Sequence, residues 1–308
     1  MLDDLFADLA ERRANDHTAE DREIARKLLR TLFKQQREFV LDPCRQKAAL
    51  CSRRAGKSYS VLVAALVMAL SKPGSNVLVI AKTRKQVKGV YWSHLKRLVA
   101  DYGIRAHFRN VELEVEFANG SMMSFSGADT EDEIEKFRGQ SYDLACIDEA
   151  KSYSPDLLDE LLFSVIRPAL ADRMGTLMLI GTPGAILAGP FFEITTLSTT
   201  RYGTCARWNG KPNPKASWSV HSWTAKENVA FADSEGSSLI WREFLETKKL
   251  AGWADDDPTW LREYCGVWVP DDDALVYAYV KTNVNERPLD WFGNEGGPHG
   301  LPDGHDWQ

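Results

Sequence analysis

The stretch CSRRAGKSYS, residues 51–60, constrains this chain more than any other part of it. An apolar run, residues 48–51, precedes the turn and an apolar segment, residues 58–70, follows it, so the stretch is predicted to join a β-strand to a buried α-helix. A turn of this kind directs backbone N–H groups at a bound phosphate, and the helix N-terminus adds its positive dipole end. Lys57 would then reach the outer phosphates, and the Ser58 hydroxyl would hold magnesium.

The usual phosphate-binding pattern opens with a glycine where this chain has Cys51, and two arginines, Arg53 and Arg54, stand inside the loop. Losing that glycine costs backbone freedom but removes no phosphate ligand. A Gly-Lys-Ser triplet alone is common by chance. Its position between an apolar strand and an apolar helix makes the phosphate-binding interpretation the stronger one.

A second element, YDLACIDEA at residues 142–150, reads as an apolar strand ending in Asp148 and Glu149. In a magnesium–ATP site the first acid binds the metal and the second polarises the attacking water. The alternative is a strand that meets solvent with two acids. The element follows Lys57 in a chain with the right strand alternation, so the two signals reinforce each other.

Two further elements carry candidate residues. LMLIGTPG, residues 177–184, would place Thr182 beside the γ-phosphate, or would be an ordinary strand followed by a Pro-Gly turn. KFRGQ, residues 136–140, contains Arg138, which is either an arginine finger for a neighbouring subunit or a surface partner of Glu131 or Glu135. The residues alone favour the salt bridge.

The remaining pattern predicts an α/β fold with a mostly parallel sheet covered by helices on both faces. Helices are expected over residues 18–41 and 83–102, strands over 76–81, 111–117, 143–147 and 176–180, and a hairpin turn at Asn119-Gly120. After residue 200 the chain is rich in tryptophan, with one short strand at 217–223 and helices at 238–251 and 257–265. The sequence thus predicts a core over 1–200, a smaller subregion over 201–282 and a linker or tail over 283–308.

Composition sets weaker limits. The five cysteines contain no Cys-x-x-Cys pair, which argues against a disulfide framework or a zinc site and suits a reducing cytosol. The longest apolar stretch, residues 61–70, is too short to span a bilayer. The net charge of −6 does not exclude a nucleic-acid partner, because residues 271–308 carry eight acids and two bases and the rest of the chain is neutral.

Taken together, SRRAGKS, YDLACIDEA, IGTPG and an FRG upstream of the acidic strand resemble the ATPase domain of the large terminase subunit of tailed bacteriophages. That family packages DNA into preformed heads, and its phosphate loop typically lacks the first glycine and carries an early arginine. REYCGVWVPDDDALVY, residues 262–277, resembles the segment that closes the family's ATPase region, so the resemblance covers about residues 30–280.

The resemblance implies a P-loop NTPase fold of the ASCE type and assigns roles residue by residue. Lys57 and Ser58 would hold phosphate and magnesium, Asp148 would hold magnesium and Glu149 would activate water. Thr182 would couple hydrolysis to movement, Arg53 would lie near the γ-phosphate and Arg138 would act in trans. LFKQQREF, residues 32–39, resembles the adenine-side motif, with Gln36 as the contact and Gln35 as the alternate. The implied ATP-binding set is Gln36, Ser52, Arg53, Arg54, Ala55, Gly56, Lys57, Ser58 and Thr182.

The resemblance also implies partners: ATP and Mg²⁺, double-stranded DNA, a homo-oligomeric ring on a portal protein, and a small terminase subunit, in the host cytoplasm with no membrane. The family normally continues into a nuclease domain, whereas this sequence stops at Gln308, so DNA cutting is not expected of it. The acid runs Asp255–Asp257 and Asp271–Asp273 read as solvated loops.

Where DNA would bind is open. Lys82, Arg84, Lys85, Lys88, Lys96 and Arg97, with Tyr91 and Trp92 among them, form a basic helix region that could follow a phosphate backbone. A solvated helix face with two rings in the core is the slightly favoured alternative. Two other functions remain possible on the residues: a helicase-like translocase, and a scaffold that binds ATP only to control assembly.

Overall fold

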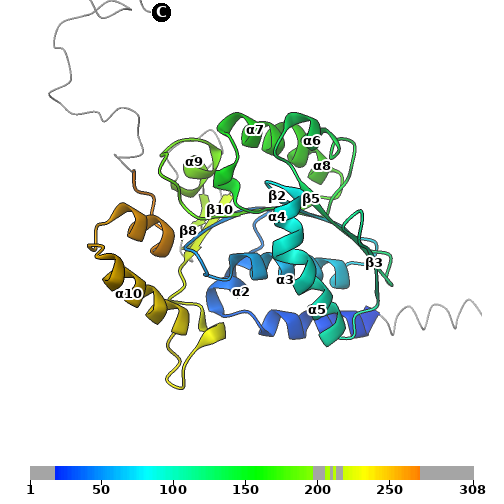
Figure 1. Ribbon diagram of the computed structural model, residues 1–308. Helices are drawn as coiled ribbons and strands as arrows, with labels where there is room; N and C mark the ends of the chain where they lie inside the picture. The colour runs from blue at the N-terminus through cyan, green and yellow to red at the C-terminus, as the bar shows by residue number, and fades with distance from the viewer. Residues whose placement is uncertain (1–17, 197–204, 209–210, 213–217, 271–308) are drawn as a thin grey trace, which may run out of the picture. The chain divides into compact units, whose positions relative to one another are not determined.

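The computed structural model describes residues 18–196, 205–208, 211–212 and 218–270 (Figure 1). Within these ranges the strands form one sheet in the order β3-β4-β5-β2-β6-β7-β1-β10-β8-β9. The strands are β1 (Gln46–Cys51), β2 (Asn76–Ala81), β3 (Ala106–Arg109), β4 (Glu114–Phe117), β5 (Met122–Gly127), β6 (Leu144–Ile147), β7 (Thr176–Gly181), β8 (Cys205–Trp208), β9 (Lys211–Pro212) and β10 (Trp218–Trp223).

The central part of the sheet is parallel. From β5 through β2, β6, β7 and β1 to β10 and β8, every neighbouring pair runs parallel, and antiparallel pairing is confined to the two ends. Parallel strands need crossover connections, and the helices between them supply these crossovers. The predicted mostly parallel α/β sheet is confirmed.

Helices cover both faces of this sheet (Figure 1). A helix over residues 18–30 begins the described chain. The helices that follow are α2 (Lys34–Leu41), α3 (Lys57–Ser71), α4 (Arg84–Val87), η1 (Lys88–Trp92), α5 (Ser93–Asp101), α6 (Glu131–Glu135), η2 (Ala150–Ser152), α7 (Pro155–Glu160), η3 (Leu161–Ile166), α8 (Arg167–Ala171), α9 (Pro190–Thr196), η4 (Val229–Phe231), α10 (Leu239–Ala251) and η5 (Trp260–Tyr264). Within the described ranges, none of the helices combines the length and apolar character needed to cross a membrane.

Two hydrophobic clusters lie on opposite sides of the sheet. In β2 the side chains alternate between them: Val77 and Val79 belong to the cluster with α3 and α5, whereas Leu78 and Ile80 belong to the cluster with η3 and α8. A strand buried on both faces needs a continuous apolar run, which is what NVLVIA supplies.

The structure corrects three details of the sequence-based prediction. The helix expected over 18–41 is wrong, because it breaks at 31–33: Phe33 is extended (φ −73°, ψ 173°) and α2 starts afresh. The strand expected over 111–117 is shorter, because Leu113 has a left-handed φ of 60° and pairing starts at Glu114. The strand at 217–223 does not belong to a separate subregion, because β10 pairs with β1 in the central sheet.

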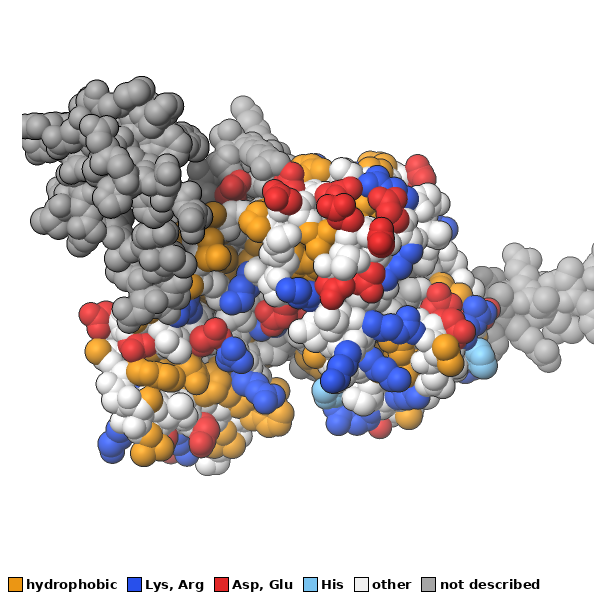
Figure 2. Space-filling model, turned by 45° about the horizontal axis from the view of Figure 1, so that its top comes forward, with side chains coloured by type: hydrophobic (Ala, Val, Ile, Leu, Met, Phe, Trp, Pro, Cys, Tyr) orange, Lys and Arg blue, Asp and Glu red, His pale blue; other side chains and the backbone are white. Residues whose placement is uncertain are grey.

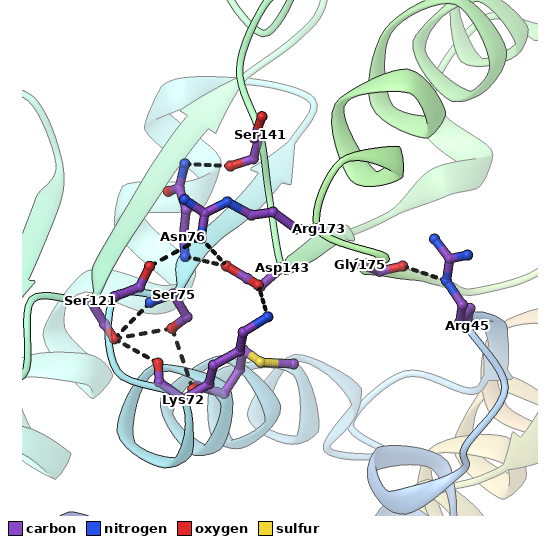
Figure 3. Close-up of polar contacts among 11 residues, drawn as sticks. Arg45, Lys72, Ser75, Asn76, Ser121, Ser141, Asp143, Arg173 and Gly175 are labelled. Atoms are coloured by element: carbon purple, nitrogen blue, oxygen red, sulfur yellow. Dashed lines mark hydrogen bonds and ion pairs between the residues drawn. The ribbon is translucent and has the colours of Figure 1, made fainter. Parts of the chain in front are cut away.

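A polar network fastens the sheet at the amino ends of its parallel strands. Figure 3 shows Lys72, Asn76 and Arg173 converging on Asp143, which is buried just before β6. Asp143 accepts from the Asn76 N–H at 2.8 Å and from Arg173 at 2.9 Å, and it pairs with Lys72. Nearby, Arg45 donates to the Gly175 carbonyl at 3.1 Å (Figure 3). The network links the ends of β2, β6 and β7, and so leaves their opposite, carboxyl ends as the edge where a site can form.

Candidate active site

The loop between β1 and α3 lies at the carboxyl edge of the sheet. It turns on two residues with left-handed backbone, Arg54 (φ 54°) and Gly56 (φ 74°). A Cβ at Gly56 would approach Gln36 Nε2 to 2.6 Å, so this position requires glycine both for its conformation and for space. Cys51, where the usual pattern has its first glycine, is a buried residue at the end of β1.

Lys57 is the first residue of α3, and its side chain contacts residues that follow two other strands. Its Nζ lies 3.0 Å from Thr182 Oγ1, which follows β7, and 3.3 Å from Glu149 Oε1, which follows β6. Lys57 and Thr182 are buried, whereas the Glu149 side chain is 42% exposed. The three predicted residues therefore meet, with the carboxylate on the open side.

Asp148 contacts the start of α3 at Ser58. Its Oδ2 accepts from Ser58 Oγ at 3.1 Å and from Tyr91 OH at 2.6 Å, and its Oδ1 accepts from the Glu149 N–H at 2.8 Å. Burial raises the pKa of the Asp148 carboxyl, and the neighbouring Glu149 charge raises it further. Burial also raises the pKa of the Tyr91 phenol, which keeps it a donor to Asp148. A cation would compensate the cost of this buried carboxylate.

Ser58 and Asp148 suit a magnesium ion. Mg²⁺ prefers octahedral oxygen ligands at about 2.0–2.1 Å, so adjacent ligand oxygens are about 3 Å apart. The Ser58 and Asp148 oxygens have this spacing. Protein sites for Mg²⁺ commonly use one or two side chains together with substrate phosphates and water. Among the described residues, no group of three or more His, Cys, Asp and Glu side chains forms a denser metal site.

Gln36 of α2 makes a hydrogen bond to the loop that the sequence did not indicate. It is buried, its Nε2 donates to the Gly56 carbonyl at 2.7 Å and its Oε1 accepts from the Phe33 N–H at 3.3 Å. Of the two glutamines considered, Gln36 is the one that touches the phosphate loop. A contact with adenine stays a prediction for both.

The side chains of the first two loop residues form hydrogen bonds and an ion pair with other parts of the same chain. Ser52 is wholly buried, and its hydroxyl accepts from the Ala225 N–H at 2.9 Å and donates to the Arg53 carbonyl at 3.0 Å. The Arg53 side chain is exposed and pairs with Glu263 of η5; this hydrogen bond raises the pKa of Arg53. Neither residue's predicted role at the phosphates is tested by these contacts.

Arg138 follows α6 on the surface. Its guanidinium contacts the Glu135 carboxylate at 2.8 Å, Glu160 at 3.0 Å and the Ser164 carbonyl at 3.0 Å. Of the two surface partners considered from the sequence, Glu135 is the one it meets. A role in a neighbouring subunit's site stays a prediction.

A cavity of about 900 Å³ adjoins the loop and separates the sheet's helices from α10. Its walls include Arg54, Tyr59 and His94 on one side and Phe231 and Phe244 on the other. Figure 2 shows this side of the molecule, with Lys and Arg side chains gathered over α4 and α5 beside a recess. The cavity is large enough for a nucleoside next to the phosphate loop.

The basic helix region has a solvated basic face and two rings in the core, as the alternative interpretation predicts. Five of its basic side chains are exposed, and Tyr91 and Trp92 are buried in the core; the exposed set is Arg84, Lys85, Lys88, Lys96 and Arg97. Lys82 is half-buried and donates to the Ser152 carbonyl at 3.0 Å. DNA contact by this surface is a prediction that the fold leaves untested.

Of the two acid runs, the structure describes only residues 255–257. Asp255 is fully exposed and pairs with Lys248, while Asp257 accepts from the Trp260 N–H at 3.0 Å. These residues lie in a loop, as predicted. Residues 271–273 and the predicted tail over 283–308 lie outside the described residues.

Three residues of the site were not found from the sequence: Tyr91, Trp223 and Asn228. Tyr91 contacts Asp148, whereas Trp223 Nε1 and Asn228 Nδ2 donate to the carbonyls of Ala55 and Arg54 at 2.8 and 2.7 Å. None lies in a recognisable motif, and each is far from the loop in sequence. Only the tertiary fold brings them there.

Comparisons with known proteins agree with this fold. Residues 44–180 match the family model described as "Phage terminase large subunit". None of the curated protein sequences matches the chain. Among solved structures, the large terminase ATPase domain of Thermus phage P74-26 is similar at a TM-score of 0.55 and 18% identity, covering 77% of this chain and 94% of that chain.

Two further large terminases are similar as well. One, from a thermophilic bacteriophage and solved in complex with ATP-gamma-S, gives a TM-score of 0.56 at 12% identity over 77% of this chain and 53% of its own. That of bacteriophage HK97 gives 0.53 at 15% identity over 76% and 50%. This chain therefore covers about half the length of those two. Over residues 44–180 this chain matches the phage terminase large subunit family model, and its fold is similar to that of a solved terminase ATPase domain.

Proposed function

We propose that this chain hydrolyses ATP with Mg²⁺ and uses the energy to move double-stranded DNA into a preformed phage head. The observation that carries the proposal is the meeting of three strand ends around Lys57, with Thr182 Oγ1 at 3.0 Å and Glu149 Oε1 at 3.3 Å. The match over residues 44–180 to the terminase family supports it, and so does the structural similarity to a terminase solved with ATP-gamma-S.

The chain's own residues divide the chemistry among them. Lys57 neutralises charge on the outer phosphates, and the loop N–H groups hold the remaining oxygens. Glu149, on the open side, takes a proton from the water that attacks the γ-phosphorus, and ADP is the leaving group. Ser58 and Asp148 would hold Mg²⁺, which would supply neutralisation of the phosphate charge.

The wider assembly is proposed on the family alone. The chain would form a homo-oligomeric ring on the portal protein in the host cytoplasm, with a small terminase subunit as a further partner. Arg53 would approach the γ-phosphate, and Arg138 would complete the site of the neighbouring subunit. The Trp-rich part after residue 200 would belong to the ATPase region.

The proposal is tested by phosphate release from the purified chain with ATP and Mg²⁺. Lys57→Ala should reduce the rate to background, because the outer phosphates lose their cation. Lys27→Ala is the matched control, since Lys27 is exposed on the helix over 18–30 and should leave the rate unchanged. Binding of ATP without release above the Lys57→Ala background would instead favour an assembly scaffold, and separation of a forked duplex would favour a helicase.

A further inference from the structure

Three successive carbonyls of the phosphate loop are each held by a side chain from outside it. Asn228 Nδ2 donates to the Arg54 carbonyl at 2.7 Å, Trp223 Nε1 to that of Ala55 at 2.8 Å, and Gln36 Nε2 to that of Gly56 at 2.7 Å. All three donors are buried: Asn228 is 4% exposed, Trp223 3% and Gln36 2%.

These bonds fix the direction of the N–H groups that follow. In a trans peptide the C=O of one residue and the N–H of the next point to opposite sides of the chain. Carbonyls drawn outward at 54, 55 and 56 therefore turn the N–H groups of Ala55, Gly56 and Lys57 to the other side. Among the described residues, none of these three N–H groups makes a well-aligned hydrogen bond to a protein acceptor, so they remain available to a ligand.

Asn228 is itself held in place. Its backbone N–H donates to the Ala225 carbonyl at 3.2 Å, and its Oδ1 accepts from the Ala230 N–H at 3.3 Å. The Ala225 N–H in turn donates to Ser52 Oγ at 2.9 Å, and Ser238 Oγ donates to the Ala225 carbonyl at 2.7 Å. The turn after β10 is therefore hydrogen-bonded to the loop at both Ser52 and Arg54. The side-chain amide of Asn228 cannot move away from the loop without breaking several of these bonds.

We propose that Asn228 and Trp223 are positioning residues for phosphate binding: they hold the loop with its N–H groups aimed at the nucleotide's phosphates before the nucleotide arrives. This inference rests on the proposed function and deepens it. Neither side chain touches a phosphate. Each lowers the cost of binding because a preorganised loop has less conformational freedom to lose.

The test measures dissociation constants for ADP, and for pyrophosphate, which has phosphates but no base. Neither variant adds charge: Asn228→Ala removes the donor to Arg54 together with the acceptor of the Ala230 N–H, and Trp223→Phe removes only the donor to Ala55. The phenyl ring is expected to keep contact with Phe39, whose ring centroid lies 5.7 Å from that of Trp223. A buried carbonyl left without its donor disfavours the ordered loop. Each variant should bind both ligands about tenfold more weakly, which corresponds to about 1.4 kcal/mol.

The fold offers a matched control for each variant. Asn119 Nδ2 donates to the Ala69 carbonyl at 2.8 Å and its Oδ1 accepts from the Ser121 N–H at 3.0 Å, as Asn228 does at the loop. Trp92 is buried and its Nε1 donates to Asn110 Oδ1 at 3.2 Å. Asn119→Ala and Trp92→Phe should lower Tm by amounts similar to their counterparts, yet leave both dissociation constants within about twofold of wild type.

The outcomes separate the two claims. If the wild-type chain binds ADP and both loop variants bind it equally well, the positioning role is overturned while the proposed function stands. Equal losses in the control variants would also overturn it, because the effect would then be general destabilisation. A wild-type chain that binds no ADP contradicts the proposed function itself, and the inference with it. Should Asn228→Ala fail to fold, Trp223→Phe alone decides between these results.

Discussion

At the scale of single residues, Glu149 has a strained backbone at the centre of the site. It is not glycine, yet its backbone is left-handed (φ 50°, ψ 46°), a conformation that costs an ordinary residue about 1 kcal/mol. The turn lets its N–H reach Asp148 Oδ1 while its side chain extends to Lys57. Backbone strain of this kind is commonly retained where it positions a reacting group.

Glu149→Gln should separate binding from chemistry. The amide keeps the size of the side chain but cannot accept a proton from water, so phosphate release should fall by about 10²–10⁴-fold. ATP affinity with Mg²⁺ should stay within a few-fold of wild type, because the loop and Lys57 are intact. Stopped-flow phosphate release and calorimetric ATP binding measure the two quantities.

The control for this prediction is Glu116→Gln, which changes another exposed glutamate, paired with Arg109 on β3 at 3.1 Å. Its turnover should equal that of wild type. Unchanged turnover in Glu149→Gln would remove this residue from the role of general base. A loss of ATP binding would instead mean that the carboxylate is needed to hold Lys57.

At the scale of elements, the Asp143 network should control how firmly the strands are joined. Burial by itself would raise the pKa of the Asp143 carboxyl, but hydrogen bonds from Lys72 and the Asn76 N–H, and the charges of Lys72 and Arg173, lower it below its ordinary 3.8. A carboxyl with a depressed folded-state pKa adds stability above the unfolded pKa, and that stability is lost as pH falls through the folded pKa.

Asp143→Asn should therefore lower the free energy of unfolding at pH 7 by about 1–3 kcal/mol, since the amide cannot pair with the two cations. The difference from wild type should shrink as pH falls below about 3.8, the ordinary pKa, and should continue to shrink until Asp143 becomes protonated in the folded protein at its lower pKa. Denaturant unfolding across this pH range measures it. Asp172→Asn is the control, because Asp172 is exposed and accepts from Ser141 at 3.0 Å. A difference that does not depend on pH would contradict the ionic origin.

The part of the chain from α10 to η5 depends on aromatic packing. The rings of Trp260 and Tyr264 are stacked at 5.3 Å, and Trp241 lies 5.6 Å from Trp260. No residue of α10 is fully buried, so these ring contacts supply much of what holds the helix in place.

Trp260→Ala should loosen α10 and η5 while leaving the sheet folded. Removing a buried tryptophan typically costs about 3–5 kcal/mol, which exceeds what a helix without buried residues can replace. Hydrogen exchange should accelerate at α10 amides by at least about a hundredfold and stay unchanged in β1. Leu250→Ala, at an 87% exposed position of α10, should have no such effect. Equal protection in both variants would show that other contacts hold the helix.

How far the sequence predicts the site depends on where each residue lies along its element. Lys57, Asp148, Glu149 and Thr182 each follow a buried strand, and parallel strands end at one edge, so local pattern was sufficient to bring them together. Tyr91 was placed either in a basic helix region that could follow DNA or, as the slightly favoured alternative, in the core. Helical periodicity shows that a residue is buried but not which atom its hydroxyl meets.

The break at 31–33 shows why other details were missed. Leu28 and Leu32 continue the apolar period of the first helix, so the pattern gives no sign of an interruption. The break becomes favourable only when Gln36 bonds both to the Phe33 N–H and to the Gly56 carbonyl. Trp223 was likewise assigned to a separate subregion, because a six-residue strand at the far end of the chain carries no local sign of its partner strand.

At the scale of the whole molecule, the predicted role of Arg138 in a neighbouring subunit's site would make one chain an incomplete enzyme. Its guanidinium is bonded to Glu135 and Glu160, on a surface where the acids of α6 and α7 gather (Figure 2). In this position its positive charge is paired with carboxylates of its own subunit. If it serves a neighbour, it must exchange these carboxylates for the charge that develops on a phosphate in the next subunit's site.

Subunit mixing tests this exchange directly. Arginine fingers contribute about 10³–10⁵-fold in rate, so Arg138→Ala alone should be nearly inactive in a ring, as should Lys57→Ala alone. Rings that contain both variants should regain part of the turnover, because an intact Lys57 site can lie beside a subunit that keeps Arg138. Arg26→Ala, which breaks a comparable pair with Glu23 three residues away, should be fully active without mixing. Verified mixed oligomers with no recovered phosphate release would leave Arg138 as a surface residue that only stabilises α6 and α7.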